Sequence, residues 1–498
     1  MPRPAFAAAP LAVSLLRNTG YNMAASLAPV ALSLITIPIY IRHMGDARYG
    51  VTVIFAAILG YFGVLDLGLS RAVAQRIAAI RDDDPERRST IFWSAACVNA
   101  SLGLAGGLLI LPVAEWVFGQ QIKVPPELRP ELSSAAPWLA VAVPVALLTQ
   151  VLRGAMQGAE RFAALNLITT SSAFVSQLVT LAVALTVSVK LTVILPVMFA
   201  SRLFNFVGMG WDIARHLLPD LRPRFDRRRA LDLLSFGGWV ALSGVVSPIM
   251  TAFDRFLIGS VVGAGAVSHY TVPFQLGERI LIIPAAVSDA LFPRVAGLGI
   301  DDARVLALRT MGILTAIMTP VMIVGIVALE TFLSLWISPE FAALSAPAGR
   351  ILLAGCCINS FAAPFFVQLQ AGGRPRLVAM AHVIEVGPFL AVLYAGLHFW
   401  GLPGAATAFS LRVAADCFLL ARFGGAFRPA VRMALVPAVL TGLALAAGPY
   451  CNLGSPGGLA AGALVAALAG LFGLRRLADC GLAPAQVLRS LRPSRSPA

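Results

Sequence analysis

The chain has 498 residues, of which 58% are hydrophobic and only 12% are charged, and its mean hydropathy is +0.83. A soluble globular domain carries about 25% charged residues, so this composition excludes a mainly soluble protein. The net charge of +14 is almost entirely due to arginine, because lysine occurs only at Lys123 and Lys190. These basic residues lie in short segments between apolar runs, which favours a membrane protein and argues against nucleic acid as the partner.

Apolar runs long enough to cross a bilayer recur along the whole chain. A spanning helix needs about 20 mainly apolar residues. On this criterion we predict an all-α, polytopic membrane protein with about fourteen spans, or twelve if the last two do not both cross. In chain order the predicted helices are 19–41, 50–70, 91–118, 134–153, 162–187, 191–214, 233–262, 267–292, 306–329, 347–371, 377–399, 404–421, 433–451 and 458–474.

The polar segments between these runs suggest six parts. The longest loop between helices carries the sequence RPRFDRRR and falls near the middle of the chain. The predicted parts are a cytoplasmic interfacial leader (1–18), an N-terminal six-helix bundle (19–214), a basic cytoplasmic linker (215–232), a C-terminal six-helix bundle (233–424), two extra helices (425–474) and a cytoplasmic tail (475–498).

The positions of lysine and arginine predict the orientation. Basic residues are enriched in the cytoplasmic loops of membrane proteins. When the loops are numbered alternately, one set carries 28 basic residues and the other set carries 5, and the larger set contains both termini. We therefore expect both termini to be cytoplasmic and the number of spans to be even.

Two pairs of short motifs suggest an internal repeat. Asp66 precedes Arg71 by five residues at the end of one predicted helix, and Asp289 precedes Arg294 by the same interval in the second half. The joint Gln157 to Arg161 likewise resembles the joint Gln370 to Arg374. Two repeats of six helices have the same orientation and are related by an axis along the membrane normal. We expect two pseudo-symmetric six-helix bundles around a central cleft.

The chain contains no catalytic or metal-binding motif of a known kind. The five histidines are dispersed, and no zinc-protease, nucleophile-elbow or phosphate-loop signature occurs. None of the six cysteines forms a Cys-x-x-Cys pair. We predict that the protein is not an enzyme and has no catalytic or metal-ligating residue.

Several motifs together suggest a family. The stretches Asn18 to Ile41, Gly45 to Gly50 and Leu65 to Ala78 are followed in the second half by Asp254 to Gly259 and Leu291 to Pro293. This pattern resembles the Wzx-type polysaccharide flippases of the MOP exporter superfamily, which also holds the MATE exporters and the MurJ-type lipid II flippases. The likeness covers roughly residues 15–425.

The resemblance implies a function. Such proteins move an undecaprenyl-pyrophosphate-linked oligosaccharide from the inner to the outer leaflet of the bacterial inner membrane by alternating access, for lipopolysaccharide or exopolysaccharide synthesis. It implies no cofactor, a coupling ion (H⁺ or Na⁺), and as partners membrane lipid, a polysaccharide polymerase and glycosyltransferases.

Arginines near or inside the predicted spans are the candidate substrate contacts. A charge at mid-membrane costs about 2.5–3.5 kcal/mol, so each one needs a reason. Arginine is permanently charged and grips phosphate oxygens in bidentate fashion. For each candidate the structural alternative is an ion pair or, at helix ends, membrane orientation. The predicted substrate-binding residues are Arg279, Arg255, Arg202, Arg48 and Arg153.

Acidic residues and helix-end pairs are the candidates for coupling or gating. Asp254 and Glu278 lie in predicted helices next to the candidate arginines. The repeated motif residues are more suited to locking helix ends or closing a gate, and these are Asp66, Arg71, Asp289 and Arg294. Arg412 and Asp416 are four residues apart, which predicts an ion pair on one helix face.

Two other functions remain open at this point. A MATE-like antiporter of cationic drugs has the same fold, but its cleft is expected to be lined with carboxylates and aromatic residues. A polytopic glycosyltransferase or ligase usually carries a large polar loop outside the membrane, and the longest outside loops here have about 15 residues. The basic residues within the spans favour an anionic, lipid-linked substrate.

Overall fold

The computed structural model describes residues 29–62, 69–80, 84–134, 136–217, 223, 225–228, 253–451 and 456–480. Within these residues the chain forms helices and no strand. Nine of the helices are long and apolar enough to cross a membrane, so the protein is a multi-pass, all-α membrane protein. The chain forms two compact units, Met1–Ala252 (unit 1) and Phe253–Ala498 (unit 2), which we describe separately.

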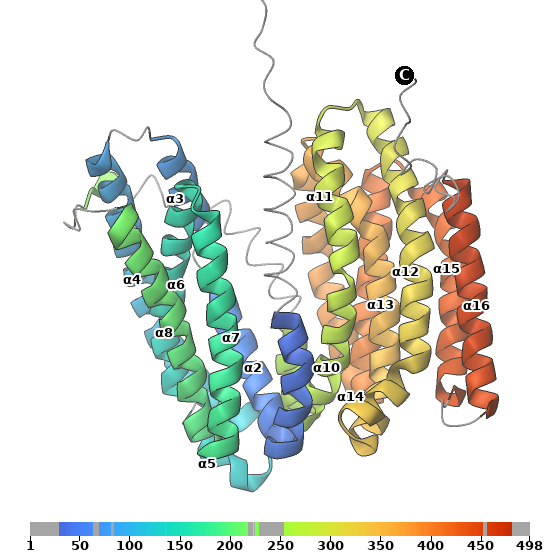
Figure 1. The fold of residues 1–498 in the computed structure, drawn as a ribbon, viewed down its shortest axis with the longest axis horizontal. Helices are drawn as coiled ribbons and strands as arrows, with labels where there is room; N and C mark the ends of the chain where they lie inside the picture. Colours follow the sequence, from blue (N-terminus) through green and yellow to red (C-terminus); the bar gives the residue numbers. More distant parts are fainter. Residues whose placement is uncertain are drawn as a thin grey trace, which may run out of the picture. The chain divides into compact units, whose positions relative to one another are not determined.

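The first described helix of unit 1 is Pro29–Met44, which leads through Gly45 into α2. Its further elements are α2 (Asp46–Phe62), α3 (Leu69–Ala78), α4 (Pro85–Trp116), η2 (Val117–Gln121), η3 (Pro126–Leu128), α5 (Arg129–Ser133), α6 (Ala136–Gly158), α7 (Phe162–Thr186) and α8 (Leu191–His216) (Figure 1). The predicted helices 162–187 and 191–214 agree closely with α7 and α8. The predicted helix 50–70 overlaps α2 and the first residues of α3, and residues 63–68 between them lie outside the described residues.

Small residues bring the helices of unit 1 into backbone contact. A Cβ atom on Gly107 of α4 would lie 2.5 Å from the carbonyl oxygen of Ala140 in α6. A Cβ atom on Gly158 of α6 would lie 2.6 Å from the carbonyl oxygen of Ala74 in α3. Only glycine permits such an approach, and small residues are enriched where membrane helices pack. Helices α3, α4 and α6 therefore form a tightly packed group.

Unit 2 contains two long central helices and a C-terminal pair. Residues 253–261 are helical and precede the other elements. These are α10 (Ala264–Ile280), α11 (Ile282–Ala296), α12 (Ile300–Trp336), α13 (Pro339–Ala371), α14 (Pro375–Phe423), α15 (Phe427–Ala447), η4 (Gly448–Tyr450) and α16 (Pro456–Asp479). Both α15 and α16 pack against α12 (Figure 1).

Two predicted boundaries in unit 2 have an identifiable physical cause. The predicted helix 267–292 is two helices, with a break at Leu281 between α10 and α11. Pro284 has no N–H to donate to the carbonyl of Ile280, which weakens the helix at this point. The element α14 contains Gly401 at φ 61° and ψ −135°, so it is two helices. This agrees with the predicted pair 377–399 and 404–421.

One helix in each unit ends with the same backbone geometry. Arg161 N–H donates to the Met156 carbonyl at 2.9 Å, and Arg374 N–H donates to the Leu369 carbonyl at 2.8 Å. The preceding residues are both left-handed, with φ 56° at Glu160 and φ 74° at Gly373. This is the Schellman ending of a helix. The joints that resemble each other in sequence thus have the same backbone geometry.

Candidate functional site

Two arginines that were predicted separately lie in one small pocket of unit 1. Arg153 comes from α6 and Arg202 from α8, and the pocket has a volume of about 70 Å³. The other lining residues are Leu59, Gly60, Ala142, Val145, Ala146, Thr149, Gln150 and Asn205. Arg153 follows Thr149 by four and Gln150 by three positions, and Asn205 follows Arg202 by three, so each arginine shares a helix face with an amide. We call this the α6–α8 pocket.

Polar atoms in the α6–α8 pocket have no partner within the protein. Arg153 Nε and Asn205 Oδ1 are both buried, and neither has a hydrogen-bond partner in the described part of the chain. Most buried polar atoms in proteins are paired, and an unpaired one costs about 1–3 kcal/mol. No carboxylate is among the described lining residues. The pocket therefore offers donors and positive charge without a negative countercharge.

Gln150 and Asn205 were not selected from the sequence. Each lies three residues from a candidate arginine, Gln150 before Arg153 and Asn205 after Arg202. This spacing could have identified them, because residues three apart on a helix are neighbours.

Arg48 is engaged at another place in unit 1. Its Nη2 donates to Oε1 of Glu131 at 3.0 Å and its Nε donates to Oε2 at 3.3 Å. Oε2 of Glu131 also accepts the N–H of Leu191 at 2.8 Å, the first residue of α8. A carboxylate at a helix N-terminus satisfies a free N–H and is favoured by the helix dipole. Arg48 thus joins α2 to α5 and α8, and its substrate contact stays a prediction.

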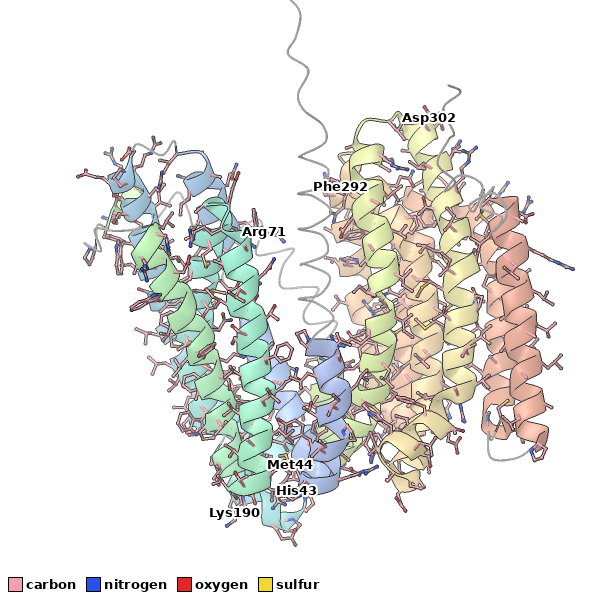
Figure 2. The ribbon with its side chains drawn as sticks, in the orientation of Figure 1. His43, Met44, Arg71, Lys190, Phe292 and Asp302 are labelled. Carbon is pink, nitrogen blue, oxygen red and sulfur yellow. The ribbon has the colours of Figure 1, made fainter. Side chains whose placement is uncertain are left out.

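The described residues of the repeated motif, Arg71, Asp289 and Arg294, are all exposed. Arg71 lies toward the end of unit 1 opposite to His43, Met44 and Lys190 (Figure 2). In unit 2, Asp289 lines a shallow hollow between α11 and α13 of about 470 Å³, and Arg294 is exposed. Asp66 falls outside the described residues. Their gating role stays a prediction.

The candidates of unit 2 form a charged group around Asp254. Asp254 is buried, and its Oδ1 accepts the N–H of Arg255 at 2.6 Å. The Arg255 guanidinium lies 5.9 Å from the ring centre of Phe274. The buried Tyr270 lies beside the Asp254 carboxyl, and Glu278 interacts with Arg255. Arg279 is exposed on the last turn of α10.

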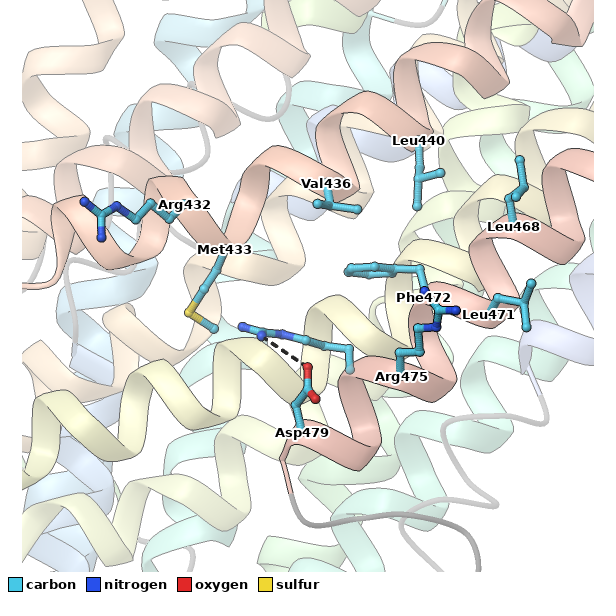
Figure 3. A pocket seen from close by; sticks show the side chains of 10 residues that line it. Arg432, Met433, Val436, Leu440, Leu468, Leu471, Phe472, Arg475 and Asp479 are labelled. Carbon is cyan, nitrogen blue, oxygen red and sulfur yellow. Dashed lines mark ion pairs between the residues drawn. The ribbon is translucent and has the colours of Figure 1, made fainter.

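A groove between α15 and α16 lies apart from all these residues. Its volume is about 660 Å³, and none of the predicted site residues lines it. Figure 3 shows an apolar wall that includes Val436, Leu440 and Leu468, with Arg432 and Arg475 nearby. Arg476 and Asp479 form an ion pair of 3.9 Å at this groove. In the described part of the chain, no group of three or more His, Cys, Asp or Glu side chains is placed to hold a metal ion.

Comparison with known proteins identifies the family. The family model described as "Polysaccharide biosynthesis protein" matches residues 15–298, more than half of the chain. A Shigella flexneri protein named "Putative O-antigen transporter" is 27% identical over 410 residues, which cover 82% of this chain and 97% of that protein. The Bacillus subtilis (strain 168) "Uncharacterized membrane protein EpsK" is 24% identical over 411 residues and covers 78% of each chain.

Solved structures share the fold. The inward closed form of the lipid II flippase MurJ has a TM-score of 0.71 at 13% identity and covers 92% of this chain and 99% of its own. An inward-facing MATE multidrug transporter of the MOP superfamily has a TM-score of 0.66 at 14% identity and covers 81% and 95%. These relatives are transporters or flippases and not catalysts, so the prediction that the chain is not an enzyme is confirmed. The predicted resemblance to Wzx-type flippases is also confirmed, and the chain belongs to the polysaccharide biosynthesis protein family.

Proposed function

We propose that the chain is a flippase of the bacterial inner membrane. It carries an undecaprenyl-pyrophosphate-linked oligosaccharide from the inner to the outer leaflet by alternating access, for the synthesis of a surface polysaccharide. The observation that carries this proposal is the α6–α8 pocket, where two arginines and two amides meet and no described lining residue is acidic. A guanidinium group binds phosphate oxygens in bidentate fashion, so two of them close together suit a diphosphate group.

In this proposal the pocket residues bind different parts of the substrate. Arg153 and Arg202 bind diphosphate oxygens, and the amides of Gln150 and Asn205 bind sugar hydroxyl groups. The Thr149 hydroxyl donates to the Val145 carbonyl at 2.6 Å, which leaves its oxygen to accept a hydrogen bond. The buried Arg153 Nε and Asn205 Oδ1 would then gain the partners that the described protein does not give them.

Other predicted residues take subsidiary roles in this proposal. Arg255 and Arg279 of unit 2 and Arg48 of unit 1 are further contacts for the anionic substrate. Asp254 and Glu278 serve a coupling ion, H⁺ or Na⁺, and Arg71, Asp289 and Arg294 act with Asp66 at a gate. The partners of the flippase in this proposal are a polysaccharide polymerase and glycosyltransferases.

The proposed orientation has both termini in the cytoplasm. In unit 1, Arg71 and Lys190 lie toward opposite ends (Figure 2). The loops assigned to the Arg71 side carry more basic residues than those assigned to the Lys190 side. This imbalance supports a cytoplasmic position for the Arg71 end.

Complementation tests the function. In a strain that lacks its own copy of this gene, the wild-type chain should restore the surface glycan. The double variant Arg153→Ala/Arg202→Ala should fail at equal membrane levels, and Arg129→Ala should succeed, because Arg129 is exposed and does not line the pocket. Normal glycan with the double variant would remove the pocket from the mechanism.

The MATE-like antiporter is the second candidate, favoured by the fold shared with the MATE structures. Its test uses a strain that lacks its drug exporters. Restored drug resistance, together with no restoration of surface glycan, would replace the flippase proposal by this one.

A further inference from the structure

Two carboxylic side chains of unit 2 meet because α14 is a hairpin of two helices. Gly401 has a φ of 61°, which reverses the chain direction between the two helices of α14. A Cβ atom on Gly396 would lie 2.7 Å from the carbonyl oxygen of Gly404, so the two helices touch near the turn. Glu385 lies sixteen residues before Gly401 and Asp416 lies fifteen residues after it. The hairpin therefore places Glu385 and Asp416 opposite each other.

The carboxyl groups of Glu385 and Asp416 lie within hydrogen-bonding range of each other. Glu385 is only 4% exposed. Both of its carboxyl oxygens and Oδ1 of Asp416 are buried, and no N–H or O–H of the described residues donates to them. Three buried acceptor oxygens with no donor among the described residues are an unfavourable arrangement for two carboxylates.

The neighbouring cations do not supply the missing donor. His382 Nε2 lies 3.6 Å from Asp416 Oδ1, just beyond hydrogen-bond distance. The Arg412 guanidinium lies 5.6 Å from the ring centre of Phe389 and 5.5 Å from that of Phe409, and its Nε has no partner among the described residues. The guanidinium acts on the Asp416 carboxyl, as the spacing of the two residues predicts, but Asp416 Oδ1 and Arg412 Nε have no hydrogen-bond partner among the described residues. The two rings draw the guanidinium toward themselves by cation–π attraction.

Few charged groups surround Glu385 and Asp416. Of the charged groups in the described part of the chain, His382 and Arg412 act on the two carboxyls. Asp254 acts on Arg412 from the helical residues 253–261, and Tyr270 of α10 faces Asp254 rather than the pair. Helices α13 and α15 also pack against α14, but no described charged group of theirs acts on the pair.

We propose that Glu385 and Asp416 share one bound proton and form a proton-binding site in unit 2. The proton provides the hydrogen bond that the two carboxyls lack and removes the repulsion between two buried like charges. Paired carboxyls in contact bind a proton for this reason, since both do not ionise together. His382 has the most exposed side chain of the three, at 28%, and is the group through which the proton enters and leaves.

Infrared spectroscopy tests this site without any substrate, so its result does not depend on the proposed function. The full-length purified protein in lipid at neutral pH should show the C=O stretching band of a protonated carboxylic acid, which shifts in D₂O. Glu385→Gln should remove the intensity of one carboxyl. The double variant Glu385→Gln/Asp416→Asn should remove no more than that, because only one proton is bound.

The matched control is Asp301→Asn. Asp301 has a side chain that is 83% exposed and pairs with Arg304 away from the buried carboxyls, so its loss should leave the band unchanged. An unchanged band in Glu385→Gln would overturn the proposal. If the double variant lost the band intensity of two protonated carboxyls, that would also overturn the proposal, since each residue would then hold its own proton. Size-exclusion chromatography of each variant shows that the comparison is made on folded protein.

Discussion

Arg161, between α6 and α7, donates two hydrogen bonds to Asp212 in α8. Its Nε bonds to Oδ2 and its Nη2 bonds to Oδ1, both at 2.7 Å. Oδ1 of Asp212 also lies 3.5 Å from Nδ1 of His216. The pair ties the joint between α6 and α7 to the last turns of α8, so the backbone turn at Glu160 and Arg161 is anchored by a side chain.

Replacing Asp212 should weaken unit 1. Asp212→Asn removes the charge and one acceptor while it keeps the shape of the side chain. We expect a loss of about 1–3 kcal/mol in the free energy of unfolding, the range for hydrogen bonds to a charged group that is mostly buried. The measurement is thermal unfolding of the purified protein followed by size-exclusion chromatography. Asp301→Asn is the control, and equal stability of the two variants would contradict the prediction.

The backbone contact between α4 and α6 gives a second prediction. Gly107→Ala places a Cβ atom 2.5 Å from the Ala140 carbonyl oxygen, so the helices must separate. We expect a destabilisation of about 1–3 kcal/mol, as for overpacking in a core. The same change at Gly442 of α15, which has nothing within 4 Å of its Cβ position, should be neutral or stabilise by up to about 1 kcal/mol. Equal effects of the two variants on the unfolding temperature would refute the close contact.

The two Schellman endings predict effects of opposite sign. Glu160 has a φ of 56° and Gly373 a φ of 74°. Because a left-handed conformation is strained for residues with a Cβ atom, Glu160→Gly should be neutral or stabilise the protein by up to about 1 kcal/mol. Gly373→Ala should destabilise it by about 1–2 kcal/mol. Unfolding temperatures of both variants against the wild type decide this, and a loss in Glu160→Gly would contradict the shared geometry.

A carboxylate in the α6–α8 pocket should block an anionic substrate. Asn205→Asp changes almost only the charge, and like charges in a binding site cost several kcal/mol. We expect export of the surface glycan to fall at least about tenfold, equal to about 1.4 kcal/mol, at unchanged protein level. Quantified surface glycan in the complemented strain is the measurement. Export by Asn205→Asp that equals the wild type would indicate a substrate without negative charge at this point.

Helix positions were predictable where polar residues flank an apolar run. Glu160 and Arg161 precede α7, and Lys190 precedes α8, so both helices begin where the sequence places them. The break at Leu281 was missed, because the segment from 267 to 292 has about the length of a single span. A single proline changes the hydrogen bonds of a helix without changing the hydropathy of the segment.

The candidate residues were predictable singly, but their grouping was not. Arg153 and Arg202 stand out because charge is rare in spans, yet the pocket that joins them depends on how α6 packs on α8. Glu385 and Asp416 are 31 residues apart in the sequence, and the φ of Gly401 decides which residues of the hairpin meet. The spacing of Arg412 and Asp416 predicts their attraction, but not that the guanidinium also lies near the rings of Phe389 and Phe409.

The glycine contacts between α3, α4 and α6 also limit how unit 1 can change shape. Helices that meet through side chains can slide, because those side chains switch rotamers to follow the motion. At Gly107 and Gly158 backbone meets backbone, and no rotamer is available to absorb a shift. These three helices should therefore move together as one rigid group. Bending in unit 1 is then left to elements outside this group, such as α7, whose main neighbour is α8.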